Sequence, residues 1–242
     1  MLGVACEVLA GMLGAPNGSS AAKLPNSRSA PQNRWREPVV IRFHRGDLPD
    51  GAAFGDSVAI DTETLGLVPH RDRLCLVQLA AGDGSADIVQ IAQGQGRAKN
   101  IERILADPDV TKLFHFARFD LAILFHTFGV MAAPVYCTKI ASKLARTYTD
   151  RHGLKDLVRE LLGVELSKQQ QLTDWGADTL TEAQISYAAS DVLHLHALRQ
   201  RLDAMLEREG RSVIAKACFA FLPARVRLDL LGWAELDIFS HQ

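Results

Sequence analysis

The sequence predicts one globular domain of the α/β or α+β class, with a β-sheet layered against helices. Strand-like apolar runs come first, and segments with helical periodicity follow them, mixed with one further strand. The chain has 242 residues, 48% of them hydrophobic, which is enough to bury a sizeable core. No apolar run approaches the roughly 18 residues that a membrane span needs. We therefore expect a single domain over residues 38–242.

Residues 1–37 differ from the rest of the chain in composition. Gly, Ala, Ser, Asn and Pro dominate there, without a sustained hydrophobic period. A secretory signal does not fit, because the first basic residue is Lys23 and Glu7 occupies the place of a positive n-region. We expect a disordered N-terminal extension, and an over-extended gene start would give the same pattern.

The first half of the domain carries the strand signals. They are short apolar runs bounded by turn residues, over Ser57–Asp61, Leu74–Ala80 and Asp87–Ile91. A helix is expected near Asn100–Leu105. A further strand over Lys112–Phe116 then runs into a helix whose apolar stripe consists of Leu121, Leu124, Phe125 and Phe128.

Helices dominate the second half. They are expected over Thr138–Ala145, Leu154–Leu162 and Thr181–Glu209, with Thr181 as the N-cap of the last. The final stretch, Ser212–Gln242, is more apolar than a dangling tail. It fits equally a helix that closes the core and a subunit interface.

Two acidic residues at the end of the first strand form the first motif. Side chains alternate along a strand, so Asp61 and Glu63 project from the same face. Like charges at that distance repel each other, and divalent cations such as Mg²⁺ or Mn²⁺ prefer carboxylate oxygens. The pair indicates half of a metal site, although D-x-E also occurs by chance on solvated loops.

A third acidic residue, Asp120, falls in the first turn of the helix after the strand Lys112–Phe116. Taken alone, it fits a carboxylate that complements the helix dipole. The third motif lies in the long helix, where Tyr187 and Asp191 are four residues apart and share one face. An exposed polar stripe would have the same spacing.

The three motifs together resemble a known superfamily. The order D-x-E, H-F-x3-D and Y-x3-D is similar to that of the DEDD 3′-5′ exonucleases, and the tyrosine resembles the DEDDy branch, which includes ribonuclease D. The sister branch has a histidine where this chain has Ser186. The resemblance implies a ribonuclease H-like mixed β-sheet flanked by α-helices in a single domain.

Shorter segments resemble the nano-RNase C family within this branch. The resemblance covers roughly Val40 to Gln242, and unlike ribonuclease D the chain has no C-terminal helical repeats. The segments are Pro69–Arg73, Tyr148–Gly153 and Leu228–Trp233. This resemblance implies hydrolysis of short oligoribonucleotides, dinucleotides above all, by a homo-oligomer.

The resemblance also implies a role for each residue. Asp61 would bridge two divalent cations, Mg²⁺ or Mn²⁺, Glu63 and Asp191 would complete the site of the nucleophilic water, and Asp120 would serve the second cation. Two such cations activate water and stabilise the leaving oxygen. Tyr187, with an ordinary pKa near 10, would position that water.

Substrate contacts are less specific in the sequence. A basic cluster contains Lys139, Lys143, Arg146, Arg151, His152 and Lys155. Lys139, Lys143 and Arg146 share a helical face, which fits phosphate binding and a solvated surface equally. The candidate substrate-binding residues are Thr62, Leu65, His115, Lys139 and Arg146, with Leu65 as a wedge under a terminal base.

Composition fits an enzyme acting on a small substrate. The 27 basic residues nearly balance 28 acidic ones, unlike the broad basic surface of proteins that coat long nucleic acids. Four separated cysteines without a C-x2-C pair favour free thiols in a reducing cytoplasm. General trimming of RNA 3′ ends, action on DNA, nucleotide phosphatase activity and a non-catalytic RNA-binding adaptor remain alternatives.

Overall fold

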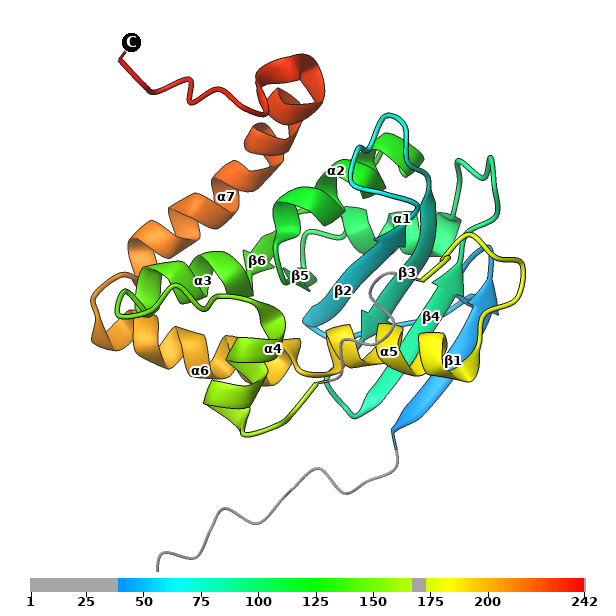
Figure 1. Cartoon of the computed structure of the whole chain (residues 1–242), viewed down its shortest axis with the longest axis horizontal. Helices are drawn as coiled ribbons and strands as arrows, with labels where there is room; N and C mark the ends of the chain where they lie inside the picture. The colour runs from blue at the N-terminus through cyan, green and yellow to red at the C-terminus, as the bar shows by residue number, and fades with distance from the viewer. Residues whose placement is uncertain (1–38, 167–172, 242) are drawn as a thin grey trace, which may run out of the picture. The chain divides into compact units, whose positions relative to one another are not determined.

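A mixed six-stranded sheet forms the centre of the domain in a computed structural model that describes residues 39–166 and 173–241 (Figure 1). The strand order is β1-β4-β3-β2-β5-β6. The pairs β4–β3 and β3–β2 at the centre are antiparallel. The pairs β1–β4, β2–β5 and β5–β6 are parallel. The bounds are β1 Val40–Arg45, β2 Ser57–Thr64, β3 Leu74–Ala80, β4 Ser85–Gln90, β5 Thr111–Phe114 and β6 Val135–Cys137.

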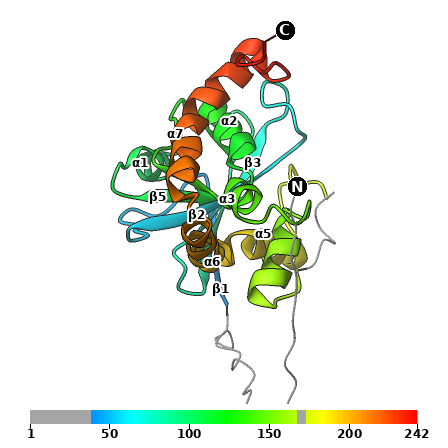
Figure 2. The ribbon, with the colours of Figure 1, turned by 90° about the vertical axis from the view of Figure 1, so that its left-hand side faces the viewer.

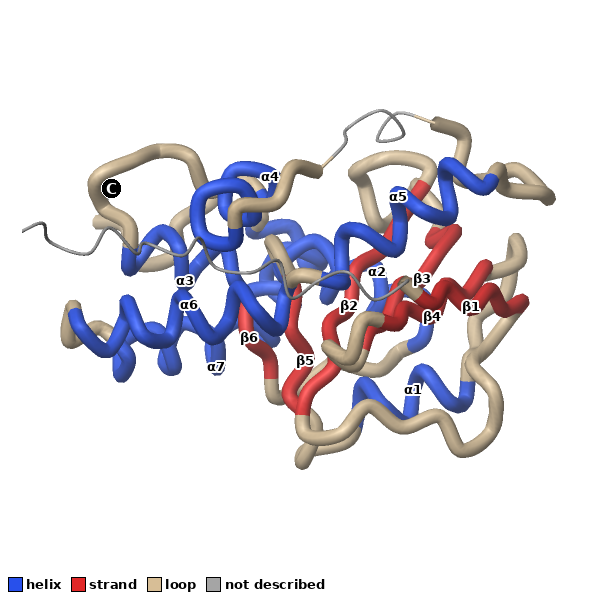
Figure 3. The backbone as a smooth tube through the Cα atoms, turned by 90° about the horizontal axis from the view of Figure 1, so that it is seen from below, coloured by secondary structure: helices blue, strands red, loops and turns tan. Residues whose placement is uncertain are grey.

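Helices flank both faces of the sheet. Helix α5 packs against β1 to β4 on one face, and Figure 3 shows α1 on the opposite face. Helix α7 runs past α2, α3 and α6 beside β6 (Figure 2). The bounds are α1 Lys99–Ala106, α2 Ala117–Phe128, α3 Thr138–Ala145, α4 Leu154–Leu157, the π-helical turn η1 Val158–Leu162, α5 Glu182–Leu193, α6 Leu195–Arg208, α7 Ser212–Leu228 and the π-helical turn η2 Asp229–Trp233.

The sheet interior is apolar. Every residue of β3 is buried, and β2 buries Val58, Ala59 and Ile60 before its acidic end. Burial on both faces explains why these strands are continuous apolar runs in the sequence. The sheet is thus a rigid support for the residues at the ends of its strands.

The predicted single layered α/β domain with a mixed sheet is confirmed, but two strands were missed. β1 is an edge strand whose polar residues face Asp87, with Arg42 Nε and His44 Nε2 each 2.8 Å from Asp87 Oδ1. β6 has three residues, too few to show a period of two. The predicted extension 1–37 and part of the segment from Ser167 to Trp175 lie outside the described residues.

Two predicted boundaries were wrong. The strand predicted to Phe116 ends at Phe114, because Phe116 adopts a left-handed conformation (φ 70°) as the N-cap of α2. The single helix predicted over Thr181–Glu209 is divided at His194 into α5 and α6, which pack on different partners: the sheet for α5, and chiefly α3 for α6. The N-cap role of Thr181 is confirmed by a capping box with Gln184.

The C-terminal stretch has both buried and exposed apolar side chains, as expected for a helix that closes the core and for a subunit interface, respectively. Helix α7 buries Phe219, Leu222 and Val226 against the domain. Exposed apolar side chains also occur in this stretch, namely Val213, Ile214, Phe221, Leu231, Trp233, Leu236, Ile238 and Phe239. Within residues 39–166 and 173–241, no helix is long and apolar enough to cross a membrane, and Cys75, Cys137 and Cys218 are free.

Candidate active site

Strand β2 and helix α5 bring three carboxylates together. Asp61 and Glu63 project from one face of β2, and Asp191 reaches them from α5, which packs over that strand. One carboxylate oxygen from each lies within 4.8 Å of the others. In the part of the chain that the structure describes, no Lys, Arg or His forms an ion pair with them, so the cluster is an uncompensated acidic site.

Asp120 lies just outside this trio. It is buried in the first turn of α2, where its Oδ1 accepts a hydrogen bond of 2.7 Å from the Thr62 hydroxyl. Thr62 lies between Asp61 and Glu63 and points away from them, as strand alternation requires. Its hydroxyl therefore holds Asp120 in place. Thr62 also lines the cleft described below, so its predicted contact with substrate stays a prediction.

Tyr187 accompanies Asp191 on α5, one helical turn earlier. Its ring packs on Trp175, with ring centroids 6.1 Å apart. Burial raises the pKa of Tyr187 well above its usual 10, and the nearby carboxylates Asp191, Glu63 and Asp61 raise it further. The phenol therefore keeps its proton at neutral pH and can donate a hydrogen bond.

Burial and mutual repulsion disfavour charge on the carboxylates. Burial, and then the charges of Asp120, Asp191 and Glu63, raise the pKa of Asp61 well above its usual value. Burial raises the pKa of Glu63 to about 9, with repulsion from Asp191 and Asp120 adding to it. It also raises the pKa values of Asp120 and Asp191 to about 7 each. Oxygen donors in such a set fit hard divalent cations, which would favour the ionised forms.

A cleft of about 700 Å³ opens at these carboxylates. It brings together Thr62, Leu65, His115 and Lys139 from the predicted substrate set, and Lys155 from the basic cluster. The Lys139 ammonium lies 4.2 Å from the centre of the Phe116 ring. The cleft is thus acidic at its metal-binding residues, with two lysines and several apolar side chains around them.

Arg146 was wrongly predicted as a substrate contact. It is fully buried at the end of α3, where it forms an ion pair with Glu160 and donates to the Arg151 carbonyl (2.8 Å) and the Ser142 hydroxyl (3.1 Å). Its donors hold the segment after α3 against η1. The helical stripe that suggested phosphate binding ends before Arg146, because α3 stops at Ala145.

Several apolar side chains in the cleft were not predicted. They are Leu67, Phe116, Phe119, Leu166 and Trp175. Nothing in the local sequence distinguishes Phe116 from a core residue, and its exposure comes from its left-handed backbone. Leu67 could have been suspected, since it is an apolar residue in a turn near the acidic pair.

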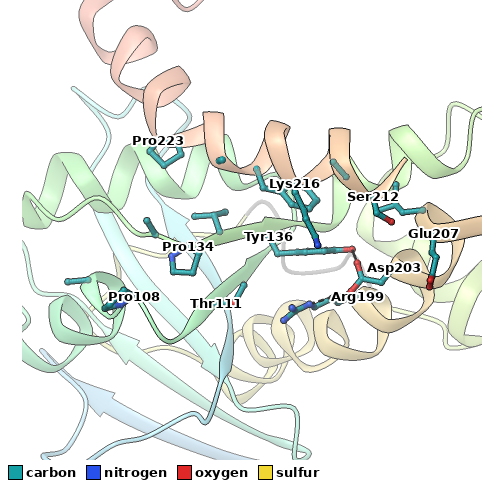
Figure 4. Close-up of a pocket in the computed structure, with 17 residues that line it drawn as sticks. Pro108, Thr111, Pro134, Tyr136, Arg199, Asp203, Glu207, Ser212, Lys216 and Pro223 are labelled. Carbon is teal, nitrogen blue, oxygen red and sulfur yellow. Dashed lines mark hydrogen bonds and ion pairs between the residues drawn. The ribbon is translucent and has the colours of Figure 1, made fainter. Parts of the chain in front are cut away.

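A larger cavity, of about 1110 Å³, lies between β6, α6 and α7 (Figure 4). Its central polar groups satisfy one another. The Tyr136 hydroxyl donates to Asp203 (2.9 Å), and the Arg199 guanidinium lies 5.4 Å from the centre of the Tyr136 ring. It contains none of the predicted site residues.

Comparison with known proteins identifies the family. The family described as 3′-5′ exonuclease matches residues 50–207, a span that holds the four carboxylates and Tyr187. The chain belongs to this 3′-5′ exonuclease family. Its mixed sheet and flanking helices match those of a solved nuclease that is 61% identical, with a TM-score of 0.83 over 85% of this chain and 100% of that chain.

Solved structures of one protein, Brucella melitensis NrnC, are similar over nearly the whole domain. Brucella melitensis NrnC with bound Mg²⁺ is 60% identical, with a TM-score of 0.81, over 84% of this chain and 100% of that chain. The same protein bound to pGG gives 60% identity and a TM-score of 0.82, over 85% and 100%.

Longer curated proteins named ribonuclease D also match. Ribonuclease D of Gluconacetobacter diazotrophicus is 42% identical over 174 residues, which are 71% of this chain and 44% of that protein. The chain spans about half the length of the curated relatives it matches.

The raised carboxylate pKa values predict how stability depends on pH. A carboxyl whose pKa is higher in the folded state than its usual value near 4 favours folding while protonated, so stability falls as pH rises through the folded value. We expect the metal-free protein to lose stability as the pH rises from about 4 to about 7, the interval between the usual and the raised pKa values of Asp120 and Asp191. Mg²⁺ should raise the melting temperature more at pH 8 than at pH 5, by roughly a few degrees.

Calorimetric melting with EDTA or Mg²⁺ across this range checks the prediction. Asp191→Asn is the matched control, because it removes one titrating carboxyl and should flatten the pH dependence. A Mg²⁺ effect that is equal at both pH values would contradict it.

Proposed function

We propose that the protein is a metal-dependent 3′-5′ exoribonuclease that hydrolyses short oligoribonucleotides, dinucleotides above all, to nucleoside 5′-monophosphates at the end of RNA decay. The observation that carries this proposal is the set of three clustered carboxylates that line a cleft of about 700 Å³, with Asp120 next to them on the Thr62 hydroxyl. That volume lies within the range of small-molecule sites. The 60% identity to NrnC, which has been solved with pGG, supports the choice of substrate.

The carboxylates would hold two divalent cations, Mg²⁺ or Mn²⁺. Asp61 would be shared between the cations, Glu63 and Asp191 would hold one of them beside it, and Asp120, on the Thr62 side, would serve the second. Cations held there supply an activated water and neutralise charge on the leaving oxygen. The NrnC structure with Mg²⁺ supports this assignment.

The other cleft residues would bind and orient the substrate. Tyr187 keeps its proton and positions the attacking water by donating a hydrogen bond. Lys139 and Lys155 offer ammonium groups to the phosphate. Leu65, which is 53% exposed, offers an apolar surface to a base.

A general ribonuclease D-like exonuclease, acting on longer RNA or on DNA, is the second candidate. The 42% identity to ribonuclease D favours it. A non-catalytic adaptor is less consistent with the chain, since all four acidic residues and Tyr187 are present.

We also propose a cytoplasmic homo-oligomer. The exposed apolar residues of α7 and the segment after it support a subunit interface, since scattered exposure would not concentrate in one stretch. Phe221 and Phe239 lie 5.9 Å apart between ring centroids and form part of this surface.

Substrate length separates the two candidate functions. We expect a 5′-labelled RNA dinucleotide to be cleaved far faster than a single-stranded RNA of about twenty nucleotides, since a confined cleft favours a ligand that it can enclose. The measurement is a time course with Mn²⁺ or Mg²⁺, with EDTA and Asp61→Ala as controls. Stepwise trimming of the long RNA while the dinucleotide persists would support the general exonuclease instead.

Replacement of Tyr187 tests its positioning role. Tyr187→Phe should lower kcat on the order of 100-fold, because the water loses its hydrogen-bond donor. The Mn²⁺ affinity, measured by titration calorimetry, should stay within about twofold, since the carboxylates are intact. Tyr148→Phe, at an exposed tyrosine outside the cleft, is the control. Full activity in Tyr187→Phe would rule out the role.

A further inference from the structure

His115 lies beside the acidic cluster at the end of the neighbouring strand. β2 and β5 pair in parallel, and Ala59 is opposite Leu113 in the last registered pair. Asp61 follows two residues later on β2, and His115 follows just beyond the end of β5; both residues line the same cleft. A nucleotide whose phosphate meets the carboxylate-held cations therefore brings its own sugar close to this ring.

Hydrogen bonds fix which ring nitrogen carries the proton. The Thr138 hydroxyl has one hydrogen, and it donates this to the Phe114 carbonyl at 3.1 Å. His115 Nδ1 lies 2.9 Å from the same hydroxyl oxygen. With that hydrogen on the Phe114 carbonyl, the hydroxyl oxygen accepts from the ring, which assigns the imidazole proton to Nδ1. The other nitrogen, Nε2, is left with a free lone pair.

Nε2 remains available to a ligand. Within residues 39–166 and 173–241 it has no hydrogen-bond partner, and it is not among the unpartnered polar atoms sealed from solvent. Since His115 lines the cleft and Nδ1 is bound to the buried Thr138, Nε2 is the nitrogen that the cleft exposes.

The ring also stays neutral. Burial lowers the pKa of His115 to about 3, and the charge of Lys139 acts in the same direction. A neutral imidazole with a free lone pair cannot donate to a phosphate oxygen from that nitrogen. It can accept a hydrogen bond from a hydroxyl group.

We propose that His115 Nε2 accepts a hydrogen bond from a ribose hydroxyl of the nucleotide whose phosphate lies at the carboxylates. This rests on the proposed exonuclease function and adds a source of sugar recognition to it. Thr138 is a positioning residue, because it fixes the tautomer that presents the lone pair.

The tautomer can be measured without turnover. Long-range ¹H–¹⁵N spectra of histidine-labelled protein distinguish Nδ1–H from Nε2–H imidazoles. We expect the His115 signals to show the neutral Nδ1–H form at pH 7, assigned by their loss in His115→Ala. A neutral Nε2–H form, or a protonated ring, would overturn the proposal.

Nucleotide binding tests the hydroxyl contact. Adenosine 5′-monophosphate, its 2′-deoxy form and its 3′-deoxy form are titrated calorimetrically with Mg²⁺ present. The wild type should bind the ribonucleotide roughly 3- to 10-fold more tightly than one of the deoxy forms, the usual size of a neutral hydrogen bond. His115→Ala should abolish that difference, and the deoxy form that is insensitive to His115→Ala identifies the hydroxyl.

Two variants separate recognition from folding. His115→Gln places an amide oxygen near the position of Nε2 and should recover part of the ribose preference. His126→Ala, at an exposed histidine on α2, should keep all of it. Equal weakening of all three nucleotides by His115→Ala would overturn the hydroxyl contact.

The two proposals fail in different ways. An enzyme that cleaves dinucleotides but binds the three nucleotides equally overturns the His115 contact alone. A ribose preference that depends on His115, in an enzyme that trims long RNA and spares dinucleotides, supports the contact and rejects the dinucleotide assignment.

Discussion

The structure depends on a repulsion that the protein alone does not relieve. One carboxylate oxygen from each of Asp61, Glu63 and Asp191 lies within 4.8 Å of the others. Burial raises the pKa values of all three, and the neighbouring negative charges raise those of Asp61 and Glu63 further. Asp120, which is hydrogen-bonded to the Thr62 hydroxyl, adds its negative charge and raises the pKa of Asp61 further. A group of this kind is stable in its ionised form only when cations join it. Binding of cations is therefore the primary property that this arrangement of carboxylates implies.

The fold holds these groups against their repulsion by placing them on rigid elements. Asp61 and Glu63 extend from a strand in the middle of the sheet, and a capping box fixes the start of the helix that carries Asp191. Asp120 sits one turn into α2, where the left-handed Phe116 begins the helix directly after β5. Sites on strands and helices are more precise than sites on loops. The packing of the sheet and of helices α2 and α5 thus offsets the unfavourable free energy of holding these carboxylates close together.

The metal-binding residues could be predicted from sequence because the order of the three motifs resembles that of the DEDDy exonucleases, whereas spacing alone left alternatives for each motif. Period two puts Asp61 and Glu63 on one face, and a spacing of four puts Tyr187 and Asp191 on another. Long-range packing decides what could not be predicted. Arg146 has the helical spacing of a phosphate contact, but the chain folds back so that Glu160 and the Arg151 carbonyl enclose it. The protonation state of His115 likewise depends on Thr138, which lies on a different element.

Proton release on metal binding tests the central claim most directly. Mn²⁺ is titrated into metal-free protein at pH 6 in buffers of different ionisation enthalpy, which gives the number of protons displaced per protein. At pH 6 the carboxyls with raised pKa values are largely protonated in the empty site. We predict release of at least about one proton, decreasing as the pH rises. Binding of Mn²⁺ without proton release at pH 6 would show that the carboxylates are already ionised and would contradict the account.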